Sequence, residues 1–187
     1  MDRYLELTLL PDPEFPQPML MNALLVKLHR ALHDVRRDDI GISFPDFRQT
    51  PRTLGARLRI HGSQGALLAL QARNWLSGMR DHVQLVGPEV VPTCARYRCV
   101  SRVQVDSSPE RLRRRLIKRH GISEEEARLR IAGNVGKQCE LPFAQVRSHT
   151  TGQVYRLFIR HGPLMDEARA GTFGGYGLSN AATVPWF

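Results

Sequence analysis

The chain has 187 residues, 42% of them hydrophobic and 24% charged, which is enough for one domain or two small ones with a buried core. Its formal net charge is +9. Residues 96–120 hold nine Lys and Arg residues against two acidic ones, a net of +7, so the rest of the chain carries only about +2. Positive charge concentrated in this way indicates a localised polyanionic partner. Nucleic acid is favoured over a membrane surface, because the segment lacks a broad Trp/Phe/Leu face.

The cysteines and the pattern of apolar residues indicate the cellular compartment in which we expect the protein. Cys94, Cys99 and Cys139 are odd in number and lack CxxC spacing, which argues against a disulfide framework and a zinc finger. The N-terminus has no signal-peptide pattern, and no apolar run reaches the length that spans a bilayer. We therefore expect a cytoplasmic protein that does not associate with membranes.

The first half of the sequence alternates strand and helix periodicities. The elements that we expect are a strand at 4–9, a helix at 18–35, strands at 40–44 and 56–61, a helix at 63–75 and a strand at 82–86. This βαββαβ order predicts the α+β class and a ferredoxin-like domain, with both helices on one face of an antiparallel sheet. Gly87, Pro88 and Pro92 then mark a boundary. We expect this domain to occupy residues 1–94, and a smaller α+β RNA-binding domain to occupy residues 95–187.

The second half contains shorter elements. We expect a strand at 97–105, a basic helix at 108–120, a helix that starts at Ser123 and ends near Gly133, and a hairpin of 143–148 with 153–160. Four glycines from Gly171 to Gly177 surround Tyr176, so the backbone there can approach a ligand closely.

The basic helix has signals at both ends. Ser108 is a good N-cap, Pro109 suits the first helical position, and Gly121 can end the helix in a left-handed conformation. Its cations are Arg111, Arg113, Arg114, Arg115, Lys118 and Arg119. A solvated charged helix is the alternative, but it would be expected to carry acidic partners four residues away, and inside the helix, after Glu110 at its start, there are none.

Few residues are candidates for catalysis. His29 lies at the edge of the apolar stripe of the first helix, where a structural histidine is the alternative to a catalyst. His33, one turn later, could pair with it on a metal ion, but no third ligand follows at suitable spacing. Tyr176 could orient a phosphate or a sugar, or simply pack its loop. Arg102 and Gln104 could read bases from a strand, or belong to a solvated sheet edge.

The sequence lacks the motifs of metal-dependent phosphoryl chemistry, including a Walker loop, HExxH and a carboxylate cluster. An enzyme would then act without a metal or cofactor. RNA permits this, because its 2′-hydroxyl can attack the adjacent phosphate when a base removes the proton. The products would be a 2′,3′-cyclic phosphate and a 5′-hydroxyl.

Seven segments together resemble a known family along the full length of the chain. They are PDPEFP, KLHRAL around His29, SRVQ, SPERLRRRL, SEEEAR, RLFIRHGP and VPWF. The chain resembles the CRISPR repeat-processing endoribonucleases of type I-F (Ypest) systems, the Csy/Cas6 family. The resemblance implies an N-terminal ferredoxin-like domain and a second domain whose arginine helix enters the major groove of a repeat hairpin.

The resemblance also implies roles for individual residues. His29 would transfer the proton of the 2′-hydroxyl, Ser148 would hold the reactive ribose, and Tyr176 would orient His29 or the scissile phosphate. The residues that would bind RNA are Arg102, Gln104, Arg111, Arg114, Arg115, Lys118, Arg119, His120, Thr150 and Tyr155. Three of these depart from the family pattern, with Tyr155 in place of a stacking Phe, Thr150 in place of a Ser and Lys118 in place of an Arg. Lys118 thereby loses the bidentate fork of arginine.

We therefore expect a metal-independent endoribonuclease that cuts repeat RNA at the 3′ base of a hairpin and stays bound to its product. A module that binds an RNA hairpin without cutting it is the main alternative, and a generic basic RNA-binding or ribosome-associated protein is another. The expected partners are the repeat RNA and the other subunits of the type I-F surveillance complex. The isolated chain is expected to be a monomer.

Overall fold

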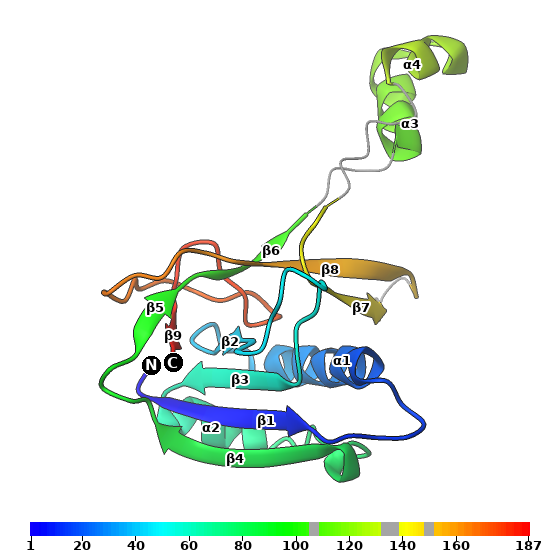
Figure 1. Cartoon of the computed structure of the whole chain (residues 1–187). Coiled ribbons are helices and arrows are strands. Elements are labelled where there is room, and N and C mark those ends of the chain that lie inside the picture. The colour runs from blue at the N-terminus through cyan, green and yellow to red at the C-terminus, as the bar shows by residue number, and fades with distance from the viewer. Residues whose placement is uncertain (105–108, 132–138, 148–151) are drawn as a thin grey trace. The chain divides into compact units, whose positions relative to one another are not determined.

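The chain folds into an α+β structure with antiparallel sheets (Figure 1). This computed structural model describes residues 1–104, 109–131, 139–147 and 152–187. The strands are β1 (Arg3–Leu9), β2 (Gly41–Ser43), β3 (Arg57–Gly62), β4 (Val83–Val90), β5 (Arg96–Arg98), β6 (Val100–Val103), β7 (Phe143–Arg147), β8 (Val154–His161) and β9 (Val184–Trp186). The helices are α1 (Gln17–Val35), α2 (Gln64–Gln71), α3 (Pro109–His120) and α4 (Glu124–Arg130), with a 3₁₀ turn, η1, at Arg80–His82.

The N-terminal elements form a four-stranded sheet in the order β2-β3-β1-β4, and every neighbouring pair is antiparallel. Strands β1 to β4 and helices α1 and α2 follow the predicted βαββαβ order. α2 is shorter than the expected helix at 63–75, and β4 is longer than the expected strand at 82–86. Along β1 the alternation of apolar and polar residues buries Leu5, Leu7 and Leu9, as the period-two pattern predicts.

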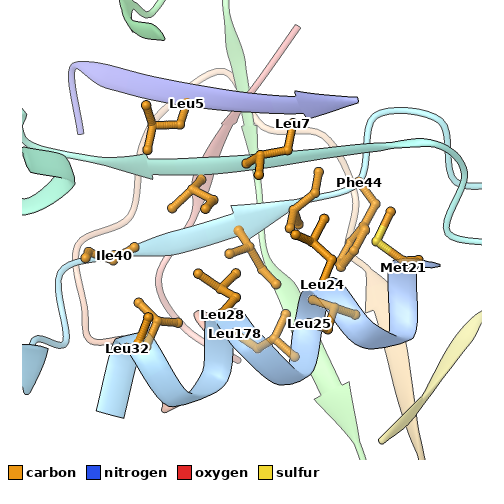
Figure 2. Packing of buried hydrophobic residues seen from close by; sticks show 14 of the residues in the cluster. Leu5, Leu7, Met21, Leu24, Leu25, Leu28, Leu32, Ile40, Phe44 and Leu178 are labelled. Carbon is orange, nitrogen blue, oxygen red and sulfur yellow. The ribbon is translucent and has the colours of Figure 1, made fainter. Parts of the chain in front are cut away.

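Helix α1 supplies much of the core. Its buried residues recur at spacings of three and four, which places them on one face. In Figure 2, Leu24 and Leu28 of α1 point toward Leu5 and Leu7 of β1, and Leu178 lies beside Leu28. The helix ends at Arg36, whose backbone is left-handed (φ 50°) and whose N–H donates to the Leu32 carbonyl. This anchored helix carries His29.

The region expected to be a single strand at 97–105 forms two strands. β5 pairs with β9, whereas β6 pairs with β8 in a three-stranded sheet of order β6-β8-β7. The chain changes partners at Cys99, whose carbonyl accepts a hydrogen bond from Gly162 N at 2.8 Å. The hairpin of β7 with β8 agrees with the prediction.

C-terminal segments pack onto N-terminal elements. Asn22 Oδ1 on α1 accepts a hydrogen bond from Gln145 N on β7 at 2.8 Å, and Ile42 N on β2 donates to the Gly177 carbonyl at 2.9 Å. The compact units are accordingly 1–103 with 141–187, and 104–140. This division groups residues 141–187 with the first half of the chain, and the two-domain organisation with a boundary after residue 94 stays a prediction.

The unit of residues 104–140 contains α3 and α4. α3 covers 109–120 as predicted and ends at Gly121, which has the left-handed φ of 64°, whereas its expected N-cap, Ser108, lies outside the described residues. Ser123 Oγ accepts a hydrogen bond from Glu126 N at 3.2 Å and caps α4. α4 ends at Arg130, earlier than the expected end near Gly133. Within the described ranges, no helix is both long and apolar enough to cross a membrane.

Candidate active site and nucleic-acid interface

His29 lies half-buried on α1, at the edge of the apolar stripe, as its position in the helical pattern predicts. Its Nδ1 is 2.6 Å from the carbonyl oxygen of Gly175. A carbonyl oxygen only accepts hydrogen bonds, so Nδ1 must carry the proton that is donated. In the neutral imidazole this leaves the lone pair on Nε2, and no described residue has a hydrogen bond with that atom. His29 is thus held in the tautomer in which Nε2 can accept a proton.

Tyr176 packs directly on this imidazole. The two rings are stacked, with their centroids 3.9 Å apart and their planes 7° from parallel. The stack fixes the plane of the His29 ring, while the Gly175 carbonyl fixes its rotation within that plane. Together these contacts direct Nε2 along a single line, which a proton-transfer group requires.

The Tyr176 hydroxyl is held by a second tyrosine. Its oxygen lies 2.7 Å from the hydroxyl oxygen of Tyr155 on β8, and either group can be the donor. The Arg102 guanidinium carbon lies over the Tyr155 ring, 5.5 Å from its centroid. The structure therefore brings together four residues that the sequence separates widely, namely His29, Arg102, Tyr155 and Tyr176.

Burial and the neighbouring Tyr155 raise the pKa of Tyr176 above the ordinary tyrosine value, and only the charge of Arg102 opposes this change. A phenol with a raised pKa stays protonated at neutral pH. Tyr176 can therefore orient groups and donate a hydrogen bond, but it does not serve as a base under these conditions.

The glycine-rich loop is fixed where it carries Tyr176. Gly174 N donates to the Leu178 carbonyl at 2.9 Å, and Gly177 N donates to the Gly174 carbonyl at 2.7 Å. Gly177 has a φ of 67°, a conformation that only glycine adopts at little cost. A Cβ at Gly175 would lie 3.3 Å from His29 Cε1, so the absence of a side chain there lets the backbone approach the imidazole.

Two other histidines are less suited to proton transfer. Burial lowers the pKa of His61 and of His161 to about 3 in each case. His61 Nε2 is engaged with Ser43 Oγ at 2.8 Å, and His161 is stacked on Phe47 at 3.7 Å. Both side chains are therefore neutral near pH 7 and have a structural role in packing. His33 is exposed and lies beside Asp34, and no group of three His, Cys, Asp or Glu side chains able to hold a metal ion occurs within the described ranges.

Helix α3 divides its cations between two faces. The exposed residues are Arg114, Arg115, Lys118, Arg119 and His120. Arg115, Lys118 and Arg119 form no ion pair with any described residue. The opposite face holds Arg113, whose Nε and Nη2 donate to the Ile131 carbonyl at 3.0 and 2.7 Å. Arg113 therefore fixes α4 to α3, and the unpaired cations are left for an external anion.

Helix α4 neutralises its own charges. Arg128 pairs with Glu124 at 2.7 Å and Arg130 pairs with Glu126 at 2.6 Å, each four residues apart. The solvated charged helix that was the alternative for α3 is thus realised in α4. The contrast supports an anionic ligand for α3, since like charges within one turn repel unless something neutralises them.

Several expected site residues are placed only in part. Ser148 and Thr150 lie outside the described residues. Arg111 belongs to α3, but its side chain lies outside the described part of the chain. Gln104 is exposed directly after β6.

Sequence reasoning missed three contributions to the site. The Gly175 carbonyl is a backbone group, which carries no sequence signal beyond the run of glycines. The Tyr155 hydroxyl was considered only as part of a stacking ring, and its link to Tyr176 spans 21 residues. Asn22, whose Oδ1 accepts a hydrogen bond from Gln145 N on β7, has no distinguishing feature in the sequence pattern of α1.

The sequence is similar to known proteins along its whole length. It matches the family described as CRISPR-associated protein (Cas_Csy4) over residues 4–187. It is 56% identical over 187 residues to a Pseudomonas aeruginosa (strain UCBPP-PA14) protein named CRISPR-associated endonuclease Cas6/Csy4, and the match covers 100% of both chains. A protein of the same name from Escherichia coli (strain UTI89 / UPEC) is 49% identical over 187 residues, again with 100% of both chains covered.

Proposed function

Because this chain belongs to the CRISPR-associated Csy4 family, we propose that it is an endonuclease that processes CRISPR RNA. The relatives described above are named endonucleases and align with it from end to end. The substrate is CRISPR repeat RNA, cut at the 3′ base of a hairpin. The observation that carries the proposal is the His29 imidazole, which is held by Gly175 and Tyr176 so that Nε2 can accept a proton.

The proposed chemistry uses the substrate's own nucleophile. His29 Nε2 takes the proton of a ribose 2′-hydroxyl, and the 2′-oxygen attacks the adjacent phosphorus as the bond from phosphorus to the 5′-oxygen breaks. The departing 5′-oxygen takes up a proton from solvent, and the His29 imidazolium releases its proton to solvent. The products are a 2′,3′-cyclic phosphate and a 5′-hydroxyl. Ser148 holds the reactive ribose, and Tyr176, which stays protonated, orients His29 or the phosphate. No metal ion or cofactor takes part.

The proposed RNA interface consists of a helix and a sheet surface. The exposed cations of α3, with His120, bind the phosphates and the groove of the hairpin stem. Arg102 and Gln104 read base edges at the foot of the stem. Arg111, Thr150 and Tyr155 complete the set of contacts. Affinity thus comes mainly from α3, and the position of the cut comes from the geometry around His29.

The N-terminal part is assigned to the ferredoxin-like arrangement. The βαββαβ order and the antiparallel sheet order β2-β3-β1-β4 support this assignment. The protein acts in the cytoplasm, is a monomer when isolated, and joins the other subunits of the type I-F surveillance complex. Size-exclusion chromatography with light scattering, alone and after co-expression with those subunits, tests the last two of these statements.

The decisive experiment is cleavage of the host's repeat RNA in EDTA, followed by analysis of the product ends. The wild type is expected to give a 2′,3′-cyclic phosphate and a 5′-hydroxyl. A single 2′-deoxy nucleotide upstream of the scissile phosphate is expected to block cleavage, because the nucleophile is missing. Cleavage of the deoxy RNA at the ribose rate would refute the mechanism.

Two histidine variants separate catalysis from binding. His29→Ala is expected to abolish cleavage and retain tight RNA binding. His33→Ala is the matched control, since His33 lies one turn further along α1, is exposed, and should leave both properties unchanged. If the wild type binds the hairpin tightly but cuts no repeat RNA, the non-cleaving binding module is the correct description.

The product is expected to stay bound. The same phosphates face α3 before and after the cut, so cleavage does not reduce the electrostatic attraction. Excess substrate should therefore give a burst of about one equivalent of product, followed by slow turnover. Rapid multiple turnover at moderate salt would contradict this expectation.

A further inference from the structure

Tyr155 reaches the candidate active site through its hydroxyl as well as its ring. It extends from β8, and its oxygen is 2.7 Å from that of Tyr176 in the glycine-rich loop. Both tyrosines are partly buried and pack against the hydrophobic core. The hydrogen bond therefore joins a strand of the three-stranded sheet to the loop that covers His29.

The Tyr176 ring needs such an anchor. Hydrogen bonds of Gly174 and Gly177 hold the loop backbone, but they do not set the rotation of the Tyr176 side chain. The stacked arrangement, at 3.9 Å and 7°, requires one specific orientation of that ring. Apart from the stack itself, the bond to Tyr155 is the directional contact that the described residues offer to the phenol.

Tyr155 is itself restrained. Its backbone pairs with Val146 on β7, and the Arg102 guanidinium lies over its ring at 5.5 Å. A cation over an aromatic face attracts the ring and limits its movement. The series Arg102, Tyr155, Tyr176 and His29 is thus a continuous set of contacts that leads from a base-reading candidate to the proton-transfer candidate.

We propose that Tyr155 is a positioning residue for His29, which it holds in place through its hydrogen bond to Tyr176. The raised pKa of Tyr176 supports this role, because its phenol stays protonated near neutral pH and can keep its hydrogen bond to Tyr155. The inference rests on the proposed function, since it assumes that the orientation of His29 controls the rate of cleavage.

Tyr155→Phe is the appropriate variant, because it removes one oxygen and keeps the ring that faces Arg102. Affinity for a 2′-deoxy hairpin should be unchanged. The single-turnover cleavage rate should fall by about 3- to 10-fold, as expected when a reacting group is only slightly misplaced. Tyr176→Phe removes the same hydrogen bond from the other side, so the double variant should be no slower than Tyr176→Phe alone. Tyr97→Phe, on β5, is the matched control and should behave as the wild type.

The imidazole proton resonances of His29 in the RNA-free protein give a readout that does not depend on activity. Stacking on Tyr176 should shift them upfield of those of exposed His33, and Tyr155→Phe should move them back toward the His33 values. Wild-type resonances in the variant would overturn the proposal, and so would weaker RNA binding at an unchanged cleavage rate. If the wild type cleaves no hairpin, the proposed function fails, while the resonances still decide whether Tyr155 positions His29.

Discussion

His29 Nδ1 and the Gly175 carbonyl oxygen are 2.6 Å apart, although 146 residues separate them in the sequence. This hydrogen bond joins α1 to the glycine-rich loop and places the imidazole proton on Nδ1. The loop can come this close because position 175 has no side chain. The proton transfer that we propose for Nε2 would therefore depend on the backbone conformation of the glycine-rich loop.

Gly175→Ala is expected to slow cleavage while the protein remains folded. The new Cβ would lie 3.3 Å from His29 Cε1 and 3.5 Å from Nδ1, so the imidazole must shift by a few tenths of an ångström. We expect the single-turnover rate to fall by about 3- to 10-fold with unchanged RNA affinity, because displacements of this size affect orientation more than binding.

Gly174→Ala is the control for this substitution. Its Cβ would meet only the Leu178 carbonyl, at an ordinary 3.6 Å, and neither Gly174 nor Gly175 has a positive φ. Equal loss of rate in the two variants would show that the loop backbone, and not the contact with His29, is responsible.

Gly177→Ala is expected to destabilise the fold. Its φ of 67° is left-handed, and a Cβ would lie 2.8 Å from Ile42 Cγ2. The backbone conformation and the overpacking together should lower the free energy of unfolding by about 2–4 kcal/mol, measured by urea denaturation. Gly65→Ala on α2 is the control, because its Cβ would meet nothing within 4 Å, and alanine should raise stability slightly.

The sequence predicted the elements whose side-chain periodicity reflects burial. Leu24, Leu25 and Leu28 recur at helical spacing because one face of α1 lies on the sheet, and Leu5 and Leu7 alternate because one face of β1 is buried. Helix ends were also predictable at Ser123 and Gly121, where capping depends on local chemistry. Such signals are contained within a few neighbouring residues.

The features that the sequence did not predict depend on pairing between distant segments. The single strand expected at 97–105 is divided at Cys99, because β9 pairs with the residues before Cys99 and β8 pairs with those after it. Neither partner can be recognised from the local sequence. The expected boundary after residue 94, which stays a prediction, was based on Gly87, Pro88 and Pro92, and the first two of these lie within β4. The local sequence also did not predict the Gly175 carbonyl and the Tyr155 hydroxyl in the site, because both reach it through contacts between distant segments.

The stability of the protein is expected to fall as the pH is lowered from 7.5 to 5. Burial lowers the pKa of His61 and His161 from 6.5 to about 3, so the unfolded chain binds more protons than the folded chain between these values. The free energy of unfolding should then decrease with falling pH, by at most about 1.4 kcal/mol per pH unit for each histidine. Urea denaturation at pH 5, 6 and 7.5 measures this slope.

His161→Phe tests the origin of the slope. Both ring nitrogens of His161 are buried without a hydrogen-bond partner among the described residues, and the ring lies among Phe44, Phe47 and Trp186. Phenylalanine should therefore be tolerated at pH 7.5 and should remove the contribution of one histidine to the slope. A slope identical to that of the wild type would mean that His161 is not the group that titrates on unfolding.

Arg115→Gln is expected to weaken RNA binding without destabilising the protein. Arg115 is exposed on α3 and has no ion pair with any described residue, so its loss removes repulsion from neighbouring cations and no internal contact. If Arg115 binds a phosphate, the slope of log Kd against log salt concentration should decrease by about 1, because one fewer counterion is released on binding. Filter binding of the 2′-deoxy hairpin at salt concentrations from about 50 to about 300 mM measures the change.

Arg113→Gln is expected to have the opposite effects, although the substitution removes the same charge from the same helix. Arg113 donates two hydrogen bonds to the Ile131 carbonyl, so its loss leaves the end of α4 without this partner and should cost about 1–2 kcal/mol of local stability. Amide hydrogen exchange in α4 should accelerate, while the salt dependence of RNA binding changes less than in Arg115→Gln. If the two variants reduce the salt slope equally and leave α4 equally protected, the two faces of α3 do not differ in function.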